Sequence, residues 1–94
     1  MKIEGIAWLR NVADKLALKH HVETQEVEQA LRNQPKIRFA EKGARKGEDL
    51  YLALGRTDAG RYLAVVFIYK RTNEALILSA RDMADKERKQ YGKK

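Results

Sequence analysis

The chain has 94 residues and a net charge of +7 at pH 7, with 20 lysines and arginines against 13 aspartates and glutamates. This length predicts one domain, residues 1–94, that can bury a core without the help of disulfides or a structural metal. The lack of cysteine excludes disulfides and thiolate metal sites. Because no signal-peptide pattern opens the chain and no apolar run approaches the roughly 20 residues that span a bilayer, we expect a cytoplasmic protein with no membrane partner.

The excess positive charge lies in two short segments. Residues 35–46 carry +4 and the basic C-terminal tail, residues 86–94, carries +4, whereas the rest of the chain carries −1. Segregated charge of this kind favours a polyanion such as a nucleic acid, and it is equally typical of a soluble surface with a basic tail.

Two helices are predicted in the first third of the chain. Ile3 and Ile6 form either a short edge strand or a lead into the first helix, and the apolar spacing over residues 8–19 is helical. Thr24 is the expected N-cap of a second helix that ends near Pro35. Its buried residues would be Val27, Ala30 and Leu31.

Four strands should follow. Residues 35–40 and 48–54 alternate with a period of two, and in the second segment we expect the three leucines to face inward, with Tyr51 and Ala53 outward. The central hairpin spans residues 61–81. Its first strand, Tyr62 to Tyr69, is apolar at almost every position, which predicts cover on both faces.

The rest of the hairpin ends in a polar signature. A turn at residues 70–74, where Asn73 tolerates positive φ, leads to a strand over residues 75–78. Arg81 then lies just beyond a buried strand, where it is well placed to hold an anion. A short helix over residues 83–91 completes an α+β fold with two N-terminal helices, a four-stranded antiparallel sheet and a C-terminal helix.

The chain lacks the patterns of several common sites. Ser79 is the only serine and has no base beside it in sequence, the adjacent His20 and His21 make no metal motif, and no glycine-rich phosphate loop occurs. We therefore expect no metal and no cofactor. General acids, bases and phosphate-holding groups remain, at Lys19, His20, Glu48, Arg61, Arg81, Glu87 and Tyr91.

This set of side chains matches RNA cleavage without a metal. A base takes the proton of the 2′-hydroxyl, the oxygen attacks the adjacent phosphorus, cations stabilise the developing charge, and an acid protonates the leaving 5′-oxygen. Each residue also has an ordinary structural interpretation. His20 would cap a helix, Glu48 would be a solvated edge charge, the two arginines would form surface ion pairs, and Tyr91 would dock the last helix on the sheet.

The ordered series of these residues resembles the BrnT family of toxins over nearly the whole chain. The matching segments are Trp8, Lys19-His20-x-Val22, Gly47-Glu48, Gly60-Arg61-x-Leu63, Ser79-Ala80-Arg81 and Glu87-Arg88-x-x-Tyr91. The chain departs from the family pattern in the first helix. It has Val12 where the family usually has lysine, Leu16 near a usual asparagine, and His21 where glycine usually follows the Lys-His pair.

The resemblance implies a compact fold related to RelE and metal-free RNA cleavage that inhibits translation. It also implies a small ribbon-helix-helix antitoxin, and repression of the operator DNA by the toxin–antitoxin complex. We hypothesise that Lys19 or His20, with Glu48, supplies the acid–base pair and that Arg61 and Arg81 hold the scissile phosphate. The residues expected to contact the RNA are Arg45, Lys46, Lys86, Arg88 and Lys89.

Two other functions fit the same sequence. One is a basic domain that grips nucleic acid or a ribosome without cutting, and the other is a domain whose basic face meets an acidic protein. Only the enzyme would leave 2′,3′-cyclic phosphate ends on RNA in the presence of a chelator.

Overall fold

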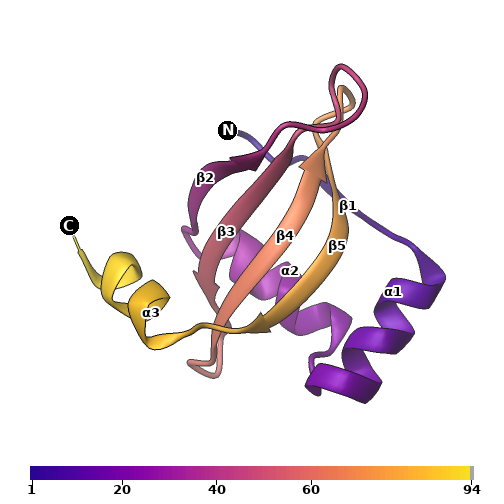
Figure 1. Ribbon diagram of the computed structural model, residues 1–94. Coiled ribbons are helices and arrows are strands. Elements are labelled where there is room, and N and C mark those ends of the chain that lie inside the picture. Colours follow the sequence, from indigo (N-terminus) through magenta and orange to yellow (C-terminus); the bar gives the residue numbers. More distant parts are fainter. Residues whose placement is uncertain (94) are drawn as a thin grey trace.

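Three helical segments, five strands and a final helix make up the computed structural model, which describes residues 1–93 (Figure 1). The elements are β1 (Gly5–Trp8), α1 (Arg10–Lys15), the π-helical segment η1 (Leu16–His20), α2 (Thr24–Arg32), β2 (Lys36–Glu41), β3 (Leu50–Arg56), β4 (Tyr62–Tyr69), β5 (Glu74–Asp82) and α3 (Asp85–Gly92). The α+β class expected from the sequence is confirmed, but the sheet differs in detail.

The sheet has five strands in the order β1-β5-β4-β3-β2, with β1 parallel to β5 and the other neighbours antiparallel. The prediction of four antiparallel strands is therefore wrong by one strand. Trp8 ends β1 instead of opening the first helix, and α1 begins at Arg10. The partner of β1 lies almost seventy residues along the chain, beginning with Gly5 beside Glu74, so no local pattern announces the pairing.

Both faces of the sheet are covered. Val22, Val27 and Ala30 of the N-terminal helical region pack on one face against side chains that include Val65 and Phe67, and this is the main core. A smaller cluster on the other face joins Leu52, Leu54, Ala64 and Met83 to Tyr62 and Tyr91. The expected cover of β4 on both faces is confirmed.

The facing of β3 is the reverse of the prediction. Tyr51 and Ala53 point into the main core beneath the helices, whereas Leu52 and Leu54 point toward α3. Alternation alone does not say which face is inside when both faces are covered, because both sets of side chains are then buried. Tyr51 stacks on Phe67 with ring centres 5.9 Å apart.

The helical region at the N-terminus turns sharply at His21. This residue has the left-handed φ of 53°, and the N–H of Val22 donates to the carbonyl of Leu16 at 3.1 Å, which closes the end of η1. Thr24, predicted as the N-cap, is the first residue of α2. The N–H of Glu23 instead donates to the Glu26 carboxylate at 3.0 Å, so Glu23 caps the helix.

The second strand of the hairpin is longer than predicted. The turn has Asn73 at φ 67°, as expected, but β5 continues past a register shift at Val66 and Phe67 of β4 to Asp82, which pairs with Leu63. Arg81 therefore lies within β5 and not beyond it. The last helix starts at Asp85, and Met83, which was expected to open it, is buried between the strand and the helix.

Candidate functional site

The sheet separates the predicted site residues into two groups. Arg45, Lys46 and Glu48 lie in the connection from β2 to β3, at the end of the sheet where Leu50 pairs with Ile68. His20, Arg61 and Arg81 lie toward the other end, where Arg56 pairs with Tyr62. A seven-residue strand separates the two ends by about 20 Å at roughly 3.3 Å per residue.

Glu48 therefore does not share a site with His20 or Arg61, and the expected acid–base pair is corrected. Its neighbourhood is the turn after β4: a Cβ added to Gly47 would lie 3.3 Å from Nε of Arg71. The sequence places Glu48 shortly before β3 but does not show which end of the sheet this loop occupies relative to the first helix.

Arg61 joins three elements at their ends. Its Nε donates to Asp82 Oδ1 at 2.7 Å, and one terminal nitrogen donates to the His21 carbonyl at 2.7 Å and to the Glu26 carboxylate at 3.2 Å. The other terminal nitrogen donates to the His20 carbonyl at 3.1 Å and to Asp82 Oδ2 at 3.3 Å. These bonds use all five N–H groups of the guanidinium, so none is left for a phosphate.

This arrangement predicts a structural effect for Arg61→Gln. The change removes charge-assisted bonds to two carboxylates and two helix-end carbonyls, and we expect it to lower the free energy of unfolding by about 1–3 kcal/mol. Urea unfolding followed by circular dichroism measures the change. Arg32→Gln is the matched control, because its ion pair with Asp58 is exposed and 4.0 Å long, so its removal should cost less than about 0.5 kcal/mol. Equal stability of the two variants would contradict the role of Arg61 as a clamp.

Arg81 forms a two-pronged pair with Glu87 of α3. One terminal nitrogen lies 2.6 Å from Glu87 Oε1 and the other 2.9 Å from Oε2, and the N–H of Ala84 also donates to Oε1 at 2.8 Å. Within residues 1–93, Nε and one hydrogen of the second terminal nitrogen of Arg81 make no bond. The side chain is 47% exposed, so Arg81 still has donors facing solvent.

The two arginines lie on opposite faces of the sheet, so the expectation that one phosphate sits between them is wrong. Arg61 reaches Asp82 and the helices of the main core, whereas Arg81 reaches α3. Successive residues of a strand point to opposite faces, and Arg81 and Asp82 are neighbours in β5. The predicted strand over residues 75–78 ends before Arg81, so the sequence does not indicate that Arg81 and Asp82 face opposite sides.

Lys19 and His20 are exposed at the end of η1. The positive charge of His20 contributes to a pKa of Asp82 below its ordinary value, although the hydrogen bond from Arg61 is the main cause. His20 therefore lies near the end of β5, on the side opposite to α3. Among residues 1–93, no three His, Asp or Glu side chains gather closely enough to hold a metal ion.

The α3 face carries the remaining predicted residues. Lys86, Arg88, Lys89 and Tyr91 all belong to this helix, whose C-terminal end is held by Lys36 donating to the Gln90 carbonyl at 3.0 Å. Tyr91 packs edge-to-face on Tyr62 with ring centres 5.9 Å apart, so it does dock the helix on the sheet. Tyr62 is a site residue that the sequence does not indicate, because it opens the apolar run of a strand that is expected to be covered on both faces.

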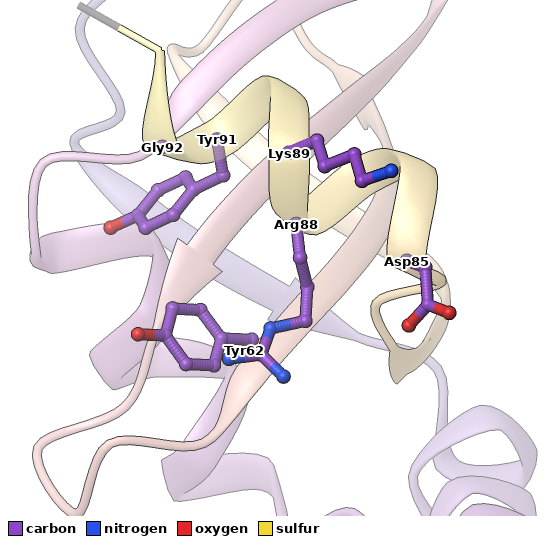
Figure 2. Close-up of a pocket in the computed structure, with 6 residues that line it drawn as sticks. All are labelled: Tyr62, Asp85, Arg88, Lys89, Tyr91 and Gly92. Carbon is purple, nitrogen blue, oxygen red and sulfur yellow. The ribbon is translucent and has the colours of Figure 1, made fainter.

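A surface cavity of about 500 Å³ lies between α3 and the start of β4 (Figure 2). The centre of the Arg88 guanidinium lies 4.3 Å from the centre of the Tyr62 ring. The lining residues are Tyr62, Asp85, Arg88, Lys89, Tyr91 and Gly92. Cations and aromatic rings thus meet at the surface in the same region as Arg81.

The ion pairs predict how stability depends on pH. The Arg81 hydrogen bonds hold the pKa of Glu87 below its usual 4.5, and Arg61 likewise lowers the pKa of Asp82 below 3.8. Because a lowered pKa stabilises the fold above the ordinary value, this contribution is complete above about pH 5 and is lost as the pH falls through the lowered pKa values. Urea unfolding at pH 7, 5 and 3 should show the loss, and Glu87→Gln should lose less between pH 5 and 3 than the parent. An equal loss would contradict this origin.

Fold and surface together define a small, basic α+β protein that presents arginine, lysine and tyrosine side chains at one end of its sheet. A family model described as "Ribonuclease toxin, BrnT, of type II toxin-antitoxin system" matches residues 8–87, and the chain belongs to this family. The resemblance read from the sequence is confirmed. A search of curated proteins finds no match. Membership implies a toxin that acts as a ribonuclease and has an antitoxin partner. No helix in residues 1–93 has the length and apolar character to cross a membrane.

Proposed function

We propose that this protein is an endoribonuclease toxin that cleaves RNA by attack of the 2′-hydroxyl, without a metal, and so inhibits translation. Family membership supports ribonuclease activity. The observation that carries the proposal is that Arg81, a half-exposed cation at the end of the sheet beside a basic helix, has N–H donors with no partner among residues 1–93. Such a group can hold a scissile phosphate and stabilise the charge that develops on it.

Each residue at this end of the sheet has a proposed role. Arg81 would hold the phosphate, and His20 or Lys19 would approach from η1 around the end of β5 as the general base. Arg61 holds the η1 end in place through the carbonyls of His20 and His21, so it is a positioning residue. RNA supplies its own nucleophile, and the chemistry needs only a base, an acid and a cation.

The surface on α3 would extend the contact with RNA. The RNA on the 3′ or 5′ side of the cut would run along Lys86, Arg88 and Lys89. Tyr91 would contact the nucleotide beside Arg81. Arg45 and Lys46 would meet only an RNA that runs the length of the sheet, since they lie at its other end. Glu48 has no role in this proposal.

The proposal extends to the partners. The family pairs its toxins with an antitoxin. We infer that the antitoxin of this chain carries a ribbon-helix-helix, that the complex represses its own operator, and that both act in the cytoplasm. Growth arrest on induced expression, relieved by the product of a neighbouring small reading frame, would support this part.

One experiment separates cutting from binding. Purified protein is incubated with end-labelled single-stranded RNA in the presence of a chelator, and the products are resolved by electrophoresis. We expect fragments that end in a 2′,3′-cyclic phosphate. Intact RNA that is nonetheless shifted in a binding assay would favour a non-catalytic binding module. That alternative draws support from the internal pairing of both arginines with carboxylates.

A further inference from the structure

We propose that Tyr62 and Arg88 form a site for an unpaired nucleobase of single-stranded RNA, in the cavity between α3 and the start of β4. The proposal rests on RNA being the substrate, as argued above, and adds how RNA is gripped beside the cut. It gives Arg88 a contact with the face of a base, where the sequence had suggested a contact with the backbone.

The cavity has the size and lining of a ligand site. Its volume of about 500 Å³ falls within the range of roughly 300–1,000 Å³ that is usual for bound small molecules. Figure 2 shows Arg88 reaching from α3 to the ring of Tyr62, with the Tyr91 ring beside them, whereas Lys89 and Asp85 extend away from the two rings. The Arg88 guanidinium and the two tyrosine rings thus line the cavity together.

The floor of the cavity is held rigidly. Tyr62 belongs to the small apolar cluster with Leu54 and Met83, and its ring packs edge-to-face on Tyr91 at 5.9 Å. The Arg88 guanidinium lies 4.3 Å over the Tyr62 ring, within the range of a cation–π contact. Because neither ring needs to move, a base that stacks here finds its platform already formed.

Arg88 differs from Arg61 and Arg81 in its partners. It pairs with no carboxylate of residues 1–93, and its only described contact of this kind is the ring of Tyr62. A guanidinium that lies over a ring can present its other face to a base, and its N–H groups, which pair with no carboxylate of residues 1–93, can meet the edge of the base or a phosphate.

The surface next to this cavity also carries an aromatic ring and a cation. A second cavity of about 420 Å³ shares Tyr91 with the first and is also lined by Asn33, Arg56, Thr57 and Asp58. Arg56 also lies 5.8 Å from the centre of the Tyr62 ring. Alternating rings and cations of this kind suit a chain of unstacked bases joined by phosphates, and a duplex would keep its bases from reaching the rings.

Binding of 2′-O-methyl RNA tests the site apart from catalysis, because such RNA lacks the nucleophile and is not cut. Fluorescence anisotropy would compare a labelled octamer of 2′-O-methyl uridylate with a fully abasic octamer of equal charge. Since stacking on an aromatic ring contributes about 1–3 kcal/mol per base, Tyr62→Leu should weaken binding of the first octamer about 5- to 150-fold and leave binding of the abasic octamer unchanged. Tyr62→Phe, which keeps the ring, should bind both octamers like the parent.

Two further variants guard against a folding artefact. Arg88→Gln changes an exposed side chain, so it should keep the protein folded even if Tyr62→Leu unfolds. It should also weaken binding of the octamer with bases more than binding of the abasic octamer. Lys89→Gln should weaken both octamers alike and reduce the salt dependence of binding by one phosphate contact. If Tyr62→Leu and Arg88→Gln weaken binding of the two octamers equally, or if they weaken binding of neither octamer, the cavity is not a site for a base. If they weaken the octamer with bases but the parent never cuts RNA, the proposed catalysis fails and the base site stands.

Discussion

Arg81→Ala should lower the rate of RNA cleavage by about 100-fold or more while the protein stays folded. Loss of one oxyanion-hole donor typically costs about 10²–10³ in rate, and we expect a similar loss for a donor to the developing charge on a phosphate. The fold should survive because Arg81 is half exposed and the Glu87 carboxylate, whose side chain is only 12% exposed, keeps the Ala84 N–H as a donor. We expect the loss of the pair to lower the free energy of unfolding by about 1–3 kcal/mol. Single-turnover cleavage of a labelled RNA measures the rate, and circular dichroism at the same temperature checks the fold.

Arg81 also anchors α3, so its partner provides the matched control. Glu87→Gln keeps an acceptor for the Ala84 N–H but removes the charge that occupies the Arg81 guanidinium. If Arg81 holds the phosphate, this variant should cleave RNA at least as fast as the parent, because the arginine gains free donors. If the arginine only fixes the helix, both changes should slow cleavage to a similar degree, and the catalytic assignment would be abandoned.

The sequence predicts well the elements whose signal is local. The apolar run from Tyr62 to Tyr69 corresponds to β4 at both ends, since cover on both faces leaves an unbroken apolar stretch. Asn73 adopts the positive φ that its side chain tolerates, and the buried residues of α2 are those its spacing indicated. In each case neighbouring residues carry the whole pattern.

The parts that the sequence misses depend on distant pairing. β1 is a strand because Gly5 and Ile6 meet β5, and nothing within four residues distinguishes it from a lead into a helix. Tyr62 reads as a core residue because the sequence does not show that α3 returns to cover it with Arg88. Tyr62 is recognised as a candidate site residue only when the contact between α3 and β4 is known.

The candidate site itself was predicted in residue type more than in arrangement. Arg61 and Arg81 look equivalent in sequence, as basic residues beside strands, yet one has all its donors satisfied and the other does not. The difference arises because Asp82 points to the helices and Arg81 to α3. The predicted strand ends at residue 78 and β5 ends at Asp82, and without those last residues the opposite facing of Arg81 and Asp82 cannot be predicted.

Gly55→Ala should be the most destabilising single methyl addition to the sheet. A Cβ at this position of β3 would lie 2.3 Å from the carbonyl oxygen of Ala30 and 2.9 Å from its carbonyl carbon, which are backbone atoms of α2. Neither can rotate away, so the helix must move off the sheet. Overpacking of this kind costs about 1–3 kcal/mol, and we expect the upper end because the obstacle is a helix and not a side chain.

Gly5→Ala is the control, since Gly5 also lies in a strand and its added Cβ would meet only the Glu74 side chain at 3.5 Å. Alanine there should be neutral or should stabilise by up to about 1 kcal/mol through the unfolded chain. The difference in urea unfolding between the two variants isolates the contact of α2 with β3. That contact also sets where Glu26 meets Arg61, and hence where η1 ends. Gly55→Ala should therefore slow RNA cleavage even at urea concentrations at which the variant is still folded. An unchanged rate in a destabilised protein would show that the position of η1 does not matter for the chemistry.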